Sequence, residues 1–200
     1  MATIALLSLL GLNVMLPWTS LGRRGTEALV RADVESHVVL GQPLPELELV
    51  GLDGRAYSRG DFLGHRVLLT FERSVDWSPY TKARLVELRE VFVATPDLQV
   101  VWVMSDIQIN DRTRSFIDEL GLANRILFLA DPKSKLIQEL GILKADPEPI
   151  EKGVPHPTTL LLDRDGRIRF IDVRTDFHIW LDPAVLVEAV GRLDATPPFS

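Results

Sequence analysis

The sequence predicts one α/β domain, in which helices flank a mixed β-sheet, preceded by an N-terminal hydrophobic helix. Continuous apolar runs of strand length alternate with segments of helical pattern, which is typical of helices packed on a sheet. Two later apolar segments flank the turn sequence at 163–166, Asp-Arg-Asp-Gly, which favours an antiparallel hairpin and makes the sheet mixed. The 200 residues, 46% hydrophobic and 25% charged, suit one domain with an adequate core.

The first half of the domain, predicted over 41–194, opens with a hairpin at 46–57. Residues 46–50 alternate in polarity as in a half-buried strand, and Leu-Asp-Gly-Arg at 52–55 supplies the turn. Two apolar runs predict buried strands, and periodic patterns predict two helices, of which the first starts at a proline. In chain order these are a strand at 67–71, a helix at 79–92, a strand at 100–104 and a helix at 112–120.

The second half continues the alternation. A short apolar run predicts a strand at 126–129, and a second proline-initiated pattern predicts a helix at 132–140. After a proline-rich loop, strands at 158–162 and 168–172 form the hairpin noted above, and a helix at 183–193 closes the domain. Residues 195–200 are expected to be a tail.

Composition excludes several classes of function. The 28 acidic residues outnumber 22 scattered basic ones, giving a net charge of −6, which disfavours nucleic acid as a partner. The chain has no cysteine, so disulfides, thiolate metal sites and thiol redox cycling are excluded. The four histidines (His37, His65, His156 and His178) lack a metal-ligand spacing, and no glycine-rich phosphate loop is present. We therefore expect neither a metal nor a cofactor.

One short motif carries the most specific signal. Trp77, Ser78, Pro79, Tyr80 and Thr81 follow a predicted buried strand and begin a predicted helix. They stand where thioredoxin-like and peroxiredoxin-like chains carry Trp-Cys-x-x-Cys. Further segments that match are Gly-Leu-Asp-Gly-Arg at 51–55, Phe-Leu-Gly-His at 62–65, the hairpin at 161–170 and Leu-Asp-Pro at 181–183. Over residues 41–193 the chain resembles the alkyl hydroperoxide reductase / thiol-specific antioxidant (peroxiredoxin-like) branch of the thioredoxin fold.

The chain departs from this family at the reactive atoms. The resemblance places Ser78 at the nucleophilic cysteine of thioredoxins, with Thr81 at the resolving position; aligned as in peroxiredoxins, Thr81 takes the peroxidatic position. A hydroxyl has no accessible pKa for a helix N-terminus to lower, so we predict no peroxidase or disulfide reductase activity. Ser78 followed by proline is instead a favoured helix N-cap. The alternative is a nucleophilic serine with His156 as its base. The resemblance also implies that Pro157 is the cis-proline beside the motif.

Residues 1–22 contain no charged side chain and are predicted to be a single-pass membrane anchor. A helix of this length is about 33 Å long, close to the hydrocarbon thickness of a bilayer, which is about 30 Å. A cleaved signal peptide and a buried helix are the alternatives. Arg23 and Arg24 favour a cytoplasmic domain, whereas many tethered thioredoxin-like domains face outward, so the side of the membrane stays open. The charged residues 23–40 are expected to be a linker.

Two functions follow from this sequence. The first is a non-catalytic interaction or structural subunit of a membrane complex, in which the former thiol face binds a protein partner and residues 1–22 hold the chain in the bilayer. The second is a redox-associated accessory protein that assists a cysteine-bearing partner without reacting itself. Both rest on an intact scaffold that lacks its two cysteines.

Overall fold

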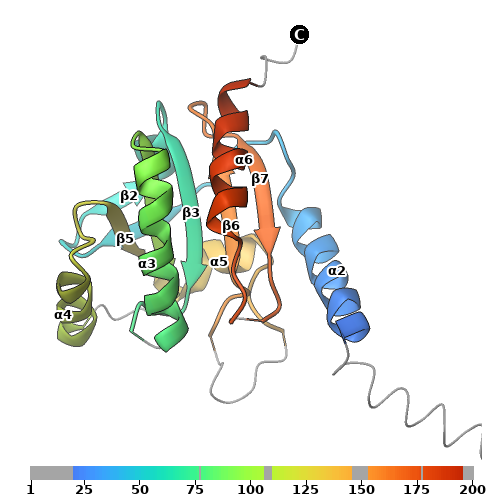
Figure 1. The fold of residues 1–200 in the computed structure, drawn as a ribbon, viewed down its shortest axis with the longest axis horizontal. Coiled ribbons are helices and arrows are strands. Elements are labelled where there is room, and N and C mark those ends of the chain that lie inside the picture. The colour runs from blue at the N-terminus through green and yellow to red at the C-terminus, as the bar shows by residue number, and fades with distance from the viewer. Residues whose placement is uncertain (1–19, 77, 106–109, 146–152, 177, 196–200) are drawn as a thin grey trace, which may run out of the picture.

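The computed structural model describes residues 20–76, 78–105, 110–145, 153–176 and 178–195. Its helices are α2 (Ser20–His37), α3 (Pro79–Ala94), α4 (Asp111–Leu120), α5 (Lys135–Glu139) and α6 (Pro183–Ala195), with 3₁₀ turns η2 (Arg59–Phe62) and η3 (Pro132–Ser134). Its strands are β1 (Glu48–Gly51), β2 (Ala56–Ser58), β3 (Arg66–Glu72), β4 (Leu98–Met104), β5 (Ile126–Ala130), β6 (Thr158–Leu162) and β7 (Ile168–Val173). The predicted mixed α/β fold is therefore confirmed (Figure 1).

The described strands form one seven-stranded sheet in the order β2-β1-β5-β4-β3-β6-β7. The three central strands, β5, β4 and β3, are parallel, while β1, β2, β6 and β7 add antiparallel pairs on either side. β3 is one of these central strands, and all seven of its residues are buried, as expected for a strand covered on both faces. The carboxyl ends of parallel strands share one edge of the sheet, which is where α/β folds place their sites.

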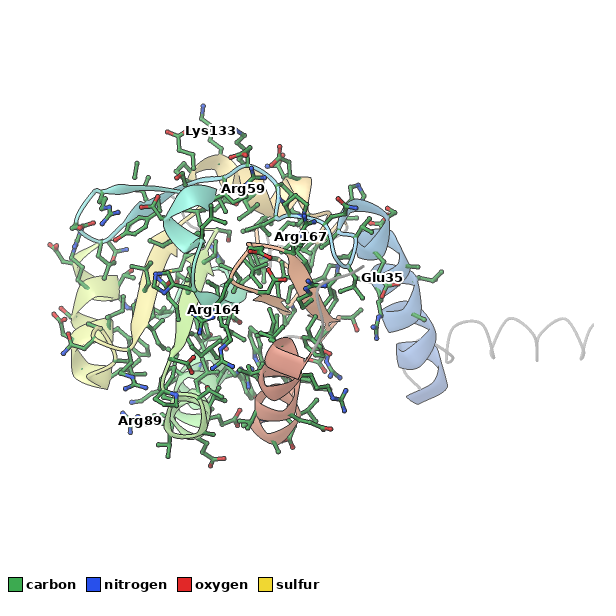
Figure 2. The ribbon with its side chains drawn as sticks, turned by 90° about the horizontal axis from the view of Figure 1, so that it is seen from above. Glu35, Arg59, Arg89, Lys133, Arg164 and Arg167 are labelled. Atoms are coloured by element: carbon green, nitrogen blue, oxygen red, sulfur yellow. The ribbon has the colours of Figure 1, made fainter. Side chains whose placement is uncertain are left out.

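Helices cover both faces of the sheet, and alternate residues of each central strand contribute to each face. On one face Leu68 and Trp102 pack with side chains of α3, α4 and α6. On the other, Leu69 and Val101 pack with side chains of α2, α5 and η2. Figure 2 shows this layering from above, with Arg89 of α3 on one side of the sheet and Lys133 of η3 on the opposite side.

The N-terminal segment differs from the prediction. Most of the segment expected to be a linker, 23–40, belongs to the 18-residue helix α2. Val34 of that helix and Val38, which follows its last residue and donates its backbone N–H to the Val34 carbonyl at 2.8 Å, are fully or almost fully buried in the core beside β7. This spacing places both side chains on one helix face, so the end of the segment packs on the domain instead of spacing it from an anchor. Polar residues between the two valines hide that pattern in the sequence.

The hydrophobic helix predicted at 1–22 lies almost wholly outside the described residues, as does the tail. Within the described part of the chain, no helix combines the length and the apolar character needed to cross a bilayer. Membrane anchoring therefore stays a prediction.

Candidate functional site

The motif lies where β3 ends and α3 begins, at the edge of the sheet that carries the carboxyl ends of the parallel strands. Ser78 has extended backbone angles and precedes Pro79, the first residue of α3. Its Oγ accepts a hydrogen bond from the backbone N–H of Tyr80 at 3.2 Å. The predicted N-cap is thus present, and the serine oxygen satisfies a backbone donor that the helix leaves unpaired. Trp77 lies outside the described residues.

Thr81 sits one turn further along α3 and is fully buried. Its Oγ1 donates to Oε2 of Glu72 at 3.4 Å. Glu72 is the last residue of β3 and is itself buried, and its Oε1 accepts from the N–H of Arg73 at 2.9 Å. The position at which relatives carry a reactive sulfur therefore holds a buried hydroxyl that donates to a carboxylate. This arrangement fixes the loop between β3 and α3, and it presents no nucleophile to solvent.

His156 and Pro157 immediately precede β6, whose first residue Thr158 lies opposite Phe71 of β3. The pairing brings them to the motif end of the sheet, as the sequence predicts. The prediction of a cis-proline is wrong, because the described residues contain no cis peptide bond. The extended segment is held by its own hydrogen bonds: the His156 N–H donates to the Ile142 carbonyl at 2.7 Å, and the Arg174 N–H donates to the Pro157 carbonyl at 2.8 Å.

A buried arginine that the sequence analysis does not single out lies one turn beyond Thr81. The Arg84 side chain has no solvent exposure, and its Nη1 donates to the Leu181 carbonyl at 2.8 Å. Its Nε and Nη2 have no hydrogen-bond partner among the residues that the structure describes. Glu87 is its nearest carboxylate, at 3.8 Å, and the Trp180 ring lies 5.5 Å from the guanidinium carbon. Burial lowers the pKa of Arg84, and Glu87 opposes that shift.

Arg84 borders a groove between α3 and residues 178–183, the segment that leads into α6; we call it the motif groove. It encloses about 630 Å³. Tyr80 forms one wall and meets His178 edge to face, with the ring centres 4.3 Å apart. Trp180 also lines the groove, and its indole Nε1 is buried with no hydrogen-bond partner among the described residues. Tyr80 thus packs against His178. The sequence gives no sign of this contact, because His178 is one of four dispersed histidines and only the tertiary fold brings it to Tyr80.

Metal chemistry has no support within the described ranges, which contain no group of three or more histidine and carboxylate side chains arranged to hold an ion. The same residues carry no thiol, since the chain lacks cysteine altogether. The site combines a capped helix start, a buried threonine–glutamate pair and a groove beside them.

A mixed sheet with helices on both faces and a capped helix after β3, one of its central strands, fits the thioredoxin-like class. The model of the AhpC/TSA family matches residues 40–171, and the chain belongs to that redox-related family. The comparison with curated proteins gives no match.

Solved structures of the same class superpose over most of the chain. The thiol peroxidase from Chromobacterium violaceum gives a TM-score of 0.66 at 17% identity, covering 78% of this chain and 87% of that one. The peroxiredoxin-like protein from Aquifex aeolicus gives 0.65 at 16% identity, covering 77% and 86%. Enterococcus faecalis AhpC gives 0.65 at 19% identity, covering 79% and 93%. At these identities the likeness establishes the fold.

Proposed function

We propose that this chain is a non-catalytic binding module of the AhpC/TSA family, whose motif end docks a segment of a partner protein. The observation that carries the proposal is the use of both motif hydroxyls inside the fold. Ser78 caps α3, and Thr81 is buried against Glu72. Neither oxygen is placed as a nucleophile, and neither can replace a thiolate.

The surface beside these residues supports docking. Tyr80 is 46% exposed and Ile179 is 41% exposed, and both of these large side chains line the motif groove, which gives it exposed apolar surface. The volume of the motif groove falls within the usual range of ligand pockets, about 300–1,000 Å³. A partner segment that covers these two side chains would remove apolar surface from water.

We propose further that residues 1–22 tether the module to a membrane and that the partner belongs to a membrane complex. The support is the uncharged, apolar character of that segment. Gentle detergent extraction of the source membrane, followed by a native gel and mass spectrometry, tests this directly. Comigration with a larger assembly is expected, and recovery of the chain in the soluble fraction would overturn the tether.

The docking face is tested by retention of the partner in that assembly. Tyr80→Asp places a charge in the apolar wall and should release the partner. Val93→Asp is the matched control, because Val93 is 85% exposed near the opposite end of the same helix. Equal retention in both variants would mean that another face carries binding.

Family membership favours a second candidate, a redox-associated accessory role beside a cysteine-bearing partner. The isolated chain should be inactive in a thiol-dependent peroxide assay under both readings. Turnover that rises when this chain is added to the partner would favour the accessory role. Turnover by the chain alone, well above that of a Ser78→Ala, Thr81→Ala double variant, would refute the absence of catalysis.

A further inference from the structure

The motif groove has two chemically distinct layers. Its base holds hydrogen-bond donors from Arg84 and Trp180, and its rim holds carboxylates from Glu87, Glu90 and Asp182. Arg84, Glu87 and Glu90 are spaced three residues apart on α3, so one face of that helix contributes to both layers, and the 178–183 segment contributes Trp180 and Asp182.

The donors at the base lack acceptors. Arg84 Nε and Nη2 and Trp180 Nε1 are buried and have no hydrogen-bond partner within the described residues. The Nε and Nη2 hydrogens of a guanidinium point in parallel, in the geometry that receives two acceptor oxygens side by side. Nη1 is already committed to the Leu181 carbonyl. Native proteins leave few buried donors unpaired, and an occupant that carries acceptors, such as the carbonyls of an extended peptide, would satisfy these three.

The rim selects the charge of that occupant. Glu87, Glu90 and Asp182 are exposed, whereas the Arg84 side chain has no solvent exposure. Viewed from solvent, the groove is therefore negative, and a negative cleft attracts and orients cationic groups. An anionic ligand would meet repulsion before it reached Arg84. Neutral backbone carbonyls satisfy the base without that repulsion, and a lysine or arginine side chain satisfies the rim.

The walls suit the same occupant. The exposed Tyr80 ring can cover an aliphatic stem and face a cationic head group. Ile179 offers a second apolar surface. Since Arg84 is 1% exposed, an occupant reaches its free edge only if the 178–182 wall shifts outward. Binding should therefore change the environment of Trp180.

Building on the proposed function, we propose that the motif groove binds an extended segment of a partner protein that carries basic side chains. Its lysine or arginine residues pair with Glu87 and Glu90, and its backbone carbonyls accept from Arg84 and Trp180. The partner class is thus a basic peptide segment, read through a carboxylate rim.

The test is selection of a random peptide library against the full chain in detergent, followed by fluorescence anisotropy with the selected peptides. We expect peptides enriched in lysine and arginine, with affinity that falls as salt rises. A Glu87→Lys, Glu90→Lys double variant should weaken binding about tenfold or more. The matched control is Asp118→Lys, Glu119→Lys on α4, which also reverses two exposed helical carboxylates and should leave affinity unchanged. Tryptophan fluorescence should change on binding to the unaltered chain.

The outcomes separate the two proposals, with circular dichroism used to confirm that each variant folds. Enrichment of acidic or uncharged peptides would overturn the basic partner and leave the docking face standing. The same conclusion would follow if the Glu87, Glu90 variant kept its peptide affinity while Tyr80→Asp lost it. Failure to select any peptide, or binding that neither set of groove substitutions alters, would overturn both the basic partner and this docking face.

Discussion

Arg84 offers the sharpest test of the structure, because it is a buried charge whose hydrogen bonding is incomplete. Two buried donors without partners cost about 1–3 kcal/mol each in the free energy of unfolding. Arg84→Met removes both donors and the desolvated charge while filling a similar volume with apolar atoms. It also removes the charge-assisted bond to the Leu181 carbonyl, which is worth about 1.5–3 kcal/mol. We expect a net stabilisation of about 1–2 kcal/mol, as in other replacements of buried charges.

Thermal and urea denaturation measure this change. In a domain of this size each kcal/mol corresponds to a rise in Tm of about 2–4 °C. Lys82→Met changes an exposed residue on the same helix, and its free energy of unfolding should stay within about 0.5 kcal/mol of that of the unaltered chain. Arg84→Lys keeps the buried charge and should gain nothing. If Arg84→Met instead loses more than about 1 kcal/mol in the free energy of unfolding, the interactions of the guanidinium fully offset the cost of its burial. Its Nε and Nη2 would then give no support to a bound acceptor. Stabilisation together with weaker peptide binding would show that Arg84 serves binding at the expense of stability.

Three further predictions concern the motif and the sheet edge. Ser78→Ala should cost about 1 kcal/mol by denaturation, because the Tyr80 N–H loses its acceptor, whereas Ser78→Asp should keep most of the stability. Thr81→Cys should give a thiol that reacts with a disulfide reagent only after the protein unfolds. The reason is that burial and the nearby Glu72 carboxylate both raise the pKa of a thiol at this position. Rapid reaction in the folded state would contradict this prediction. Burial raises the pKa of Asp131, so the contribution of this residue to the free energy of unfolding falls as pH rises from its unfolded pKa through its folded pKa. Asp131→Asn should therefore be less destabilising at pH 7 than near pH 4. A loss of stability in this variant that grows with pH would refute the shift.

The sequence predicts elements that depend on local patterns. The run at 67–71, apolar apart from Thr70, predicts β3, and the proline after Ser78 predicts the start of α3. In the same way, the turn at 163–166 gives the β6–β7 hairpin. These features need only periodicity and turn chemistry.

Features that depend on distant contacts are not predictable in this way. The motif groove joins Tyr80 to His178 and Arg84 to Leu181, and no local pattern links those positions. The sequence predicts a linker at 23–40, whereas 23–37 belong to α2, because two buried valines give too weak a period among charged residues. The cis geometry expected at Pro157 rests on the resemblance alone, because the neighbouring residues give no independent indication of it, and the structure has a trans bond there.

The two outer strands determine how this chain can meet other proteins. β2 spans three residues, which leaves a short backbone ladder on that border. On the other border, Ile168 of β7 exchanges backbone hydrogen bonds with the 41–42 segment at 2.7 and 2.9 Å, and α2 packs beside the strand. Shielded or short borders resist strand addition, the route by which open sheets aggregate or swap segments. Association through this fold is therefore directed to helix faces and loops, where side-chain chemistry can discriminate between partners.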